Sequence, residues 1–156
     1  MAEENVVERK PEAQVEQQPE FQIHKLYVKD ISFQVPNGVK AFQKDWAPEL
    51  NVEVKTESKS LEEANTHEVS LGVKCTVSSD KNTAFTCEVV QAGIFTLTNM
   101  QEEQTKHALG AYCPGILYPY LRAVMSDIVT RGGFPQLSLA PINFDLLYEE
   151  QQKTKK

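Results

Sequence analysis

The chain has 156 residues, of which 40% are hydrophobic and 24% charged, and it carries a formal net charge of -6 at pH 7. This composition is typical of one soluble globular domain and argues against an intrinsically disordered chain. The negative balance disfavours a nucleic-acid reader, which needs a basic face for phosphates. No segment of the sequence approaches the roughly 20 apolar residues of a membrane helix.

The N-terminal segment and the cysteines indicate the compartment. Residues 1–20 contain six glutamates, three glutamines and two prolines, and predict a disordered acidic tail without the apolar stretch of a signal peptide. The cysteines, Cys75, Cys87 and Cys113, are odd in number, form no CxxC pair and lie among apolar residues, as buried thiols do. A cytoplasmic protein is therefore expected.

Four segments alternate between apolar and polar residues as β-strands do: residues 21–35, 50–55, 69–77 and 83–97. In the first, Leu26 and Val28 put apolar groups on the polar side. Either a bulge shifts the register there or both faces of the strand are partly covered. Pro36-Asn37-Gly38 predicts a turn, and the polar segment 56–66 is expected to turn the chain again.

Residues 102–131 predict a pair of helices. Apolar residues recur at helical spacing along the second one: Leu117, Leu121, Val124, Met125 and Ile128. Gly132-Gly133 and Phe134-Pro135 end this helix. Upstream, Cys113-Pro114-Gly115 is expected to break the run, so that a shorter helix at 102–112 folds back beside the longer one. A last helix over residues 142–150 leads into a flexible C-terminal tail, 149–156.

Strands followed by helices predict an α+β fold, a four-stranded antiparallel sheet with C-terminal helices packed on one face. Residues 21–148 would form this single domain. The far face of the sheet is partly apolar at Val90, Ala92 and Ile94, and in so small a domain this surplus suggests self-association.

The sequence contains no arrangement of residues typical of catalysis. His24, His67 and His107 are far apart and lack metal-ligand spacing. Cys113 and His107 have no third group to orient the base, and no glycine loop has the lysine and spacing that phosphate binding needs. We therefore expect binding without catalysis, with no metal and no cofactor.

Two apolar regions suggest a ligand cleft. One side would hold Phe42, Trp46, Leu50 and Val52, and the other Tyr118, Tyr120, Phe134 and Leu137. The alternative is that these aromatic residues cap the core and that Trp46 anchors a loop. A cleft of this kind suits an extended, unfolded peptide, because apolar burial is non-directional and tolerates many sequences.

Acidic residues fall on the predicted polar faces of the strands: Asp30, Glu53, Glu68 and Glu88. They form either a solvated acidic face, which contributes little to stability, or a docking surface for a basic partner. The pattern alone leaves both open.

Five colinear segments resemble SecB, the protein-export chaperone family of bacteria: IHKLYVKDISFQVPN, FQKDWAPEL, FTCEVVQAGIF, HALGAYCPGILYPYLR and TRGGFPQLSLAPINFDLLY. The resemblance covers residues 21–148. It implies a homotetramer, assembled as a dimer of dimers, that holds unfolded preproteins in hydrophobic grooves and delivers them to the motor ATPase SecA. It also implies no cofactor, no nucleic-acid partner and no membrane insertion.

The resemblance assigns roles to particular residues. It adds Leu139 and Phe144 to the groove. It places SecA docking at Asp30, Gln34, Thr86 and Glu88, where Gln34 replaces an expected glutamate and Thr86 an expected leucine. It places Cys87, Val89 and Gln91 at the oligomer interface. Two other functions stay open: an adaptor of the same fold for a non-export partner such as an antitoxin, and a carrier or enzyme that uses the cleft for a small ligand.

Overall fold

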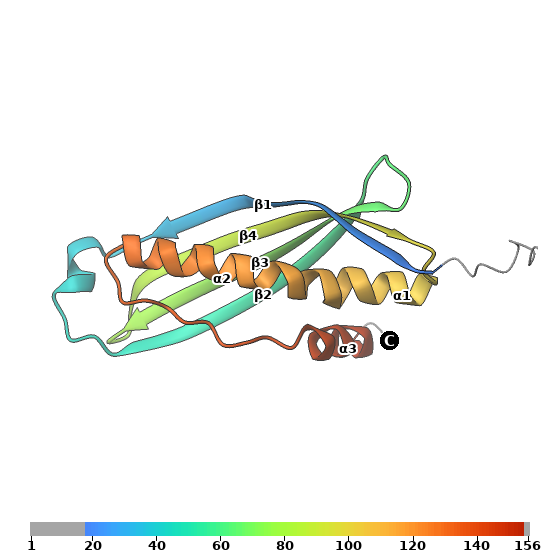
Figure 1. Ribbon diagram of the computed structural model, residues 1–156. Coiled ribbons are helices and arrows are strands. Elements are labelled where there is room, and N and C mark those ends of the chain that lie inside the picture. Colours follow the sequence, from blue (N-terminus) through green and yellow to red (C-terminus); the bar gives the residue numbers. More distant parts are fainter. Residues whose placement is uncertain (1–17, 155–156) are drawn as a thin grey trace, which may run out of the picture.

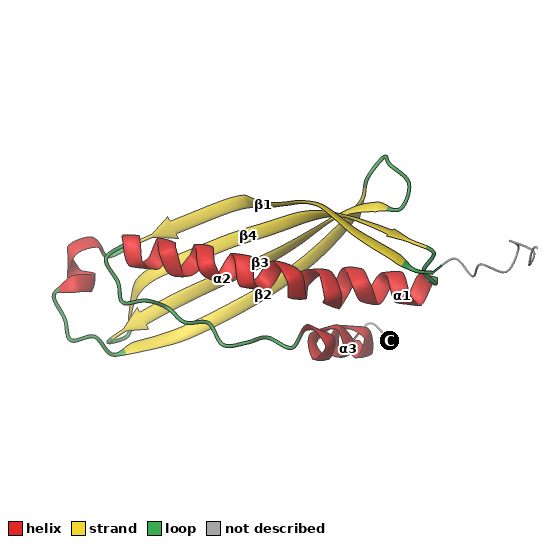
Figure 2. Cartoon of the chain, viewed as in Figure 1, coloured by secondary structure: helices red, strands yellow, loops and turns green. Residues whose placement is uncertain are grey.

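The computed structural model describes residues 18–154. Four strands form one antiparallel sheet in the order β1-β4-β3-β2 (Figures 1 and 2). They are β1 (Glu20–Gln34), β2 (Pro48–Ser60), β3 (Thr66–Ser79) and β4 (Asn82–Thr98). All helices of the described chain that follow β4 lie on one face of this sheet (Figure 1). The predicted α+β fold is confirmed. The predicted acidic tail lies, up to residue 17, outside the described residues.

β1 contains the predicted bulge, whereas β2 is longer than predicted. In β1 the register with β4 shifts between Ile23 and Lys25 and again between Val28 and Asp30, which confirms the bulge. β2 continues through the polar residues that were expected to turn the chain, because its 56–60 part pairs with β3 as far as Ser60 opposite His67. An edge strand tolerates such polar residues, since half of its surface faces water. The turn is confined to residues 61–65.

Two helices are present as predicted, but the expectation that the shorter one folds back beside the longer one is wrong. α1 (Glu102–His107), the π-helical segment η3 (Ala108–Tyr112) and α2 (Cys113–Arg131) follow one another as one rod across the sheet (Figure 1). Pro114 lies at the start of α2, where a missing N–H costs little. Immediately before it, the Cys113 N–H bonds to the Ala108 carbonyl, five residues back. This wider π-helical turn lets the chain pass the proline without a break.

The core lies between the rod and the two central strands. Val73, Cys75, Cys87 and Val89 of the sheet are fully buried against a stripe of α2 that contains Leu117, Leu121, Met125 and Val129. At the end of α2, the Phe33 ring of β1 packs so closely on Gly132 that a Cβ there would lie 2.2 Å from it.

The rod leaves parts of the two edge strands uncovered: η3 contacts β2 and the Phe21 ring at the start of β1, and Gly132 at the end of α2 meets the Phe33 ring near the end of β1. Two corners of the sheet's helix-covered face therefore keep exposed apolar side chains. One corner carries Leu50 and Val52 of β2, opposite the buried Val77 and Cys75. The other carries Ile23, Val28 and Ile31 of β1.

After α2 an extended connector, residues 132–143, leads to α3 (Phe144–Thr154) beside η3 (Figure 1). The Asn143 side chain accepts a hydrogen bond from the Leu146 N–H at 3.1 Å, as an N-cap does. α3 begins two residues later than predicted and continues to Thr154, so that residues 149–154 of the predicted tail are helical.

Candidate functional site

Five aromatic rings gather where the connector leaves α2. The centre of this aromatic cluster is Phe134, whose ring centroid lies 4.6 Å from Phe85, 4.9 Å from Phe42 and 5.7 Å from Trp46. Phe33 completes the cluster at 6.4 Å. Phe42, Trp46 and Phe134 were predicted as site residues, and the structure brings them together. Phe33 and Phe85 were missed, although both stand on the apolar faces of their strands.

The cluster is buried at its base and open at its top. Phe134 is 5% exposed, whereas Trp46 is 39% exposed and Phe42, stacked on Phe134, is 54% exposed. The neighbouring corner of β2 adds the exposed Leu50 and Val52. Exposed aromatic surface on a buried base is typical of a binding surface.

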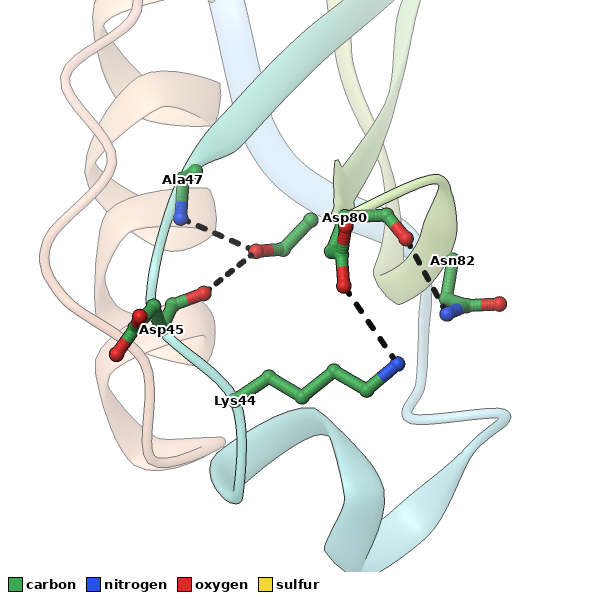
Figure 3. A network of polar contacts seen from close by, with 6 residues as sticks. Lys44, Asp45, Ala47, Asp80 and Asn82 are labelled. Atoms are coloured by element: carbon green, nitrogen blue, oxygen red, sulfur yellow. Dashed lines mark hydrogen bonds and ion pairs between the residues drawn. The ribbon is translucent and has the colours of Figure 1, made fainter.

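Polar contacts fix the loop that carries Phe42 and Trp46 (Figure 3). The Ser79 hydroxyl accepts a hydrogen bond from the Ala47 N–H at 3.1 Å and donates to the Asp45 carbonyl at 3.2 Å. Lys44 lies 3.7 Å from Asp80 at the tip of the β3–β4 hairpin. These contacts hold the loop against the hairpin, so that little ordering of the loop is needed when a ligand binds.

Leu137 and Leu139 of the connector lie further along the molecule. Together with Arg122 and Ser126 of α2 they line a shallow trough of about 660 Å³. Leu137 is half-buried and Leu139 is buried. The rest of the lining is mainly polar, including Asp127, Thr130 and Gln136, so the apolar surface offered by the connector is limited to the half-buried Leu137.

The structure places three predicted cleft residues elsewhere. Tyr118 is buried, donates from its hydroxyl to the Ala140 carbonyl at 2.5 Å and meets the buried Phe144 edge-on at 5.7 Å. Burial also raises the pKa of the Tyr118 hydroxyl. Tyr120 is exposed and, two positions further along the helix, projects about 200° away from Tyr118. For Tyr118 and Phe144, the interpretation as core residues is therefore correct.

The other sheet face brings the four predicted docking residues together. The register places Gln34 opposite Thr86 and Ser32 opposite Glu88, with Asp30 two residues away on the same side of β1. These side chains alternate with the buried ones, so they point away from α2. Asp30 and Glu88 both line a shallow hollow of about 680 Å³ on this face.

The acidic residues of this outward face have lysines beside them. Lys74 stands directly between Glu88 of β4 and Glu53 of β2. Glu68 bonds to Lys29 at 2.7 Å and accepts a hydrogen bond from the Tyr27 hydroxyl, and these contacts lower the pKa of Glu68. Burial, together with this bond, raises the pKa of Tyr27 to about 12. The face carries an alternating pattern of charges, because strand pairing places lysines beside the acids.

Cys87, Val89 and Gln91, the predicted interface residues, face α2. Cys87 and Val89 are fully buried in the core of the chain itself, so neither side chain can contact another copy in this conformation. Burial raises the pKa of the Cys87 thiol to about 11. Gln91 is 4% exposed, and its Oε1 has no hydrogen-bond partner within the described part of the chain.

Within residues 18–154, no group of three or more His, Cys, Asp or Glu side chains is placed to hold a metal ion. No helix in the same range is long and apolar enough to cross a membrane. The candidate site consists of apolar and aromatic surface, and burial of such surface is the interaction that it offers to a ligand.

Comparison with known proteins identifies the class as protein-export chaperones. The family model described as "Preprotein translocase subunit SecB" matches residues 14–155. Protein-export protein SecB 1 of Francisella tularensis subspecies novicida and SecB 2 of subspecies tularensis are each 51% identical over 136 residues, 87% of this chain and 91% of theirs. The chain belongs to the SecB family, as the sequence motifs predicted.

A solved structure shows the same fold. A SecB-like chaperone of Mycobacterium tuberculosis, in complex with a ChAD peptide from the HigA1 antitoxin, superposes with a TM-score of 0.65 at 17% identity. The match covers 78% of this chain and 90% of that one.

Proposed function

We propose that this chain is a cytoplasmic chaperone that binds unfolded precursor proteins, keeps them competent for translocation and delivers them to the SecA motor. Its client groove runs from Phe42 and Trp46 past Leu50 and Val52 to the connector at Leu137 and Leu139. The observation that supports this most strongly is the half-exposed pair of rings on the buried Phe134.

The free edge of β2 suits an extended client. β2 is the outer strand of the sheet, so one side of its backbone has no strand partner within the described chain. An unfolded segment can add there as a further strand, with main-chain hydrogen bonds that do not depend on sequence. Its alternate side chains would then contact Leu50 and Val52, which lie on the groove side.

Burial of apolar client surface would provide the affinity, at about 25 cal/mol per Å². A native client has already buried these side chains, so the groove discriminates by folding state rather than by sequence. In a tetramer, several grooves can engage one client, and weak sites then combine to high avidity.

A dimer of dimers is supported by the apolar corner at β1. Ile23, Val28 and Ile31 are exposed there, and the Gln91 amide is buried nearby without a partner for its oxygen. A second copy that covered this corner would remove apolar surface from water.

The motor would dock on the outward face of the sheet at Asp30, Gln34, Thr86 and Glu88. Charge reversal of both acids, Asp30→Lys with Glu88→Lys, is expected to abolish SecA binding and leave client binding intact. Glu57→Lys is the matched control, because Glu57 carries the same charge on the same face but pairs with Lys55 at 2.9 Å. SecA binding that survived the double reversal would place the docking site elsewhere.

A non-export adaptor of the same fold is the second candidate. It is favoured by Gln34 and Thr86, which stand where the resemblance leads us to expect glutamate and leucine. The adaptor would bind an unfolded partner peptide, as the chaperone does, but not the motor.

The proposal is tested by titrating the purified protein with one export precursor, first unfolded and then folded, while light scattering gives the mass of the complex. Tight binding of the unfolded form alone, by a species of tetramer mass, is expected. Equal binding of both forms would contradict the proposal, as would binding of neither.

A further inference from the structure

Gly72 stands in the middle of the central strand β3, on the outward face of the sheet. A glycine inside a strand weakens it, because it has no side chain to pack and leaves the unfolded chain more freedom. At Gly93 crowding explains the glycine, since a Cβ there would lie 2.7 Å from the Phe95 ring. At Gly72 a Cβ would make only ordinary contacts, 3.6 Å to Val90 and 3.8 Å to the Lys55 carbonyl oxygen. The chain thus keeps an open space above Gly72 that the fold does not require.

This space belongs to the hollow of about 680 Å³ on the outward face, called here the Gly72 hollow. Its floor is made of small or apolar residues. The half-buried Val90 of β4 stands directly opposite Gly72, and the buried Ser70 lies two residues away on β3. Charged side chains from all four strands form its rim. An apolar floor inside a charged rim suits a side chain with an apolar stem and a charged end.

The sign of the free charges on the rim is negative. Two rim lysines are already paired, Lys55 with Glu57 at 2.9 Å and Lys29 with Glu68 at 2.7 Å. Within residues 18–154, the remaining rim charges form no ion pair: three carboxylates and one ammonium group, those of Asp30, Glu53, Glu88 and Lys74. Acids exceed the lysine in this set, so the Gly72 hollow attracts a cation.

Lys74 weakens this attraction. The strand register places it opposite Glu88 on one side and opposite Glu53 on the other. It therefore lies about one strand spacing, roughly 4.8 Å, from each of the two neighbouring strands. It lies two residues from Gly72 on the same face of β3. A basic side chain above Gly72 would gain from the acids and be repelled by Lys74.

We propose that the Gly72 hollow is the seat of one arginine side chain from the segment of the motor that docks on this face. The arginine stem would lie on Gly72 and Val90, and its guanidinium group would reach the carboxylates of Asp30 and Glu88. Asp30 stands opposite Val90 in the register of β1 with β4, so the floor and this acid form one row across the strands. The inference rests on the proposed function, because it names the feature of the motor that the sheet recognises.

Gly72→Val tests the seat, because it fills the hollow and at the same time favours the strand. Gly72→Ala is a smaller step in the same direction. Lys74→Gln removes the repelling charge, and Lys59→Gln is its matched control, since Lys59 carries the same charge on the same face, opposite Glu68, but lies outside the hollow. SecA binding is measured by titration calorimetry, stability by urea denaturation, and binding of an unfolded client shows that the opposite face is intact.

Gly72→Val is expected to weaken SecA binding about tenfold or more without loss of stability or of client binding, and Gly72→Ala to weaken it less. Lys74→Gln is expected to strengthen SecA binding about threefold, whereas Lys59→Gln changes it little. Unchanged SecA binding by Gly72→Val would overturn the seat, and so would weaker binding by Lys74→Gln. A destabilised Gly72→Val would overturn the premise that the fold does not need this glycine.

A second probe separates the seat from the motor. A hexa-arginine peptide should shift the NMR methyl resonances of Val90 in the wild type and leave them in place in Gly72→Val. A hexalysine peptide, the control for charge alone, should shift them less. If the wild type bound hexa-arginine at Val90 but did not bind SecA, the proposed delivery to the motor would fail and the seat would stand. Shifts of other outward residues without Val90 would overturn the seat itself.

Discussion

The double variant Phe42→Ala with Trp46→Ala tests the groove most selectively. It removes the two open rings of the aromatic cluster and leaves the buried Phe134 in place. Because the removed rings lie at the surface, the fold should persist, with a loss of about 1 kcal/mol in the free energy of unfolding for each lost ring contact.

The effect on client binding is set by the exposed area. Trp46 and Phe42 keep 39% and 54% of their surface in water, which for rings of this size is on the order of 100 Å² each. At about 25 cal/mol per Å², complete coverage of each ring by a client contributes at most about 2.5 kcal/mol. Since a tenfold change in affinity corresponds to about 1.4 kcal/mol, we expect the double variant to bind an unfolded client roughly ten- to a hundredfold more weakly.

Isothermal titration with an unfolded precursor measures this change. Val39→Ala is the control, because Val39 is exposed in the same short helix, η2 (Gly38–Phe42), but is not part of the aromatic cluster. A double variant that folds and binds its client as tightly as the control does would refute the assignment of the groove to these rings.

Three further predictions concern the fold. Gly132→Ala forces the Phe33 ring to move and should lower the free energy of unfolding by about 1–3 kcal/mol in urea, whereas Gly115→Ala should not. Lys29 and Tyr27 lower the pKa of Glu68 in the folded protein. The ionised carboxylate therefore stabilises the fold at pH values above its ordinary pKa of 4.5, and this stabilisation is lost as the pH falls through the lowered pKa. The stability advantage of the wild type over Glu68→Gln, followed by denaturation at several pH values, should thus disappear on acidification, and a constant difference would contradict the assignment. Burial raises the thiol pKa of Cys75 and Cys113 to about 12 and that of Cys87 to about 11, so all three should react with a thiol reagent only after unfolding; rapid labelling of the native protein would disprove their burial.

Alternation of residue types was sufficient to predict the sheet. The β3 pattern from Val69 to Val77 is regular because every second side chain is buried in the hydrophobic core. The bulges in β1 were visible as a break at Leu26 and Val28. The length of β2 could not be predicted, because residues 56–60 are polar. They form a strand because they pair with β3.

The continuity of the helical rod through Cys113-Pro114-Gly115 could not be predicted from local rules. Cys113-Pro114-Gly115 is a strong stop signal, yet the π-helical turn before it accommodates the proline. For the site, the sequence identified the aromatic residues but not their directions. Tyr118 and Tyr120 diverge because they lie on different sides of one helix. Lys74 lies between Glu53 and Glu88 because of a strand register that the sequence does not encode locally.

Hydrogen exchange with and without an unfolded client tests the central claim most directly, because it locates the bound chain. We predict protection of residues 42–52 and of the connector 134–139 with the unfolded client, and none with its native form. Protection confined to the outward sheet face around Asp30 and Glu88, or the same protection with the native client, would contradict the groove and with it the proposed function.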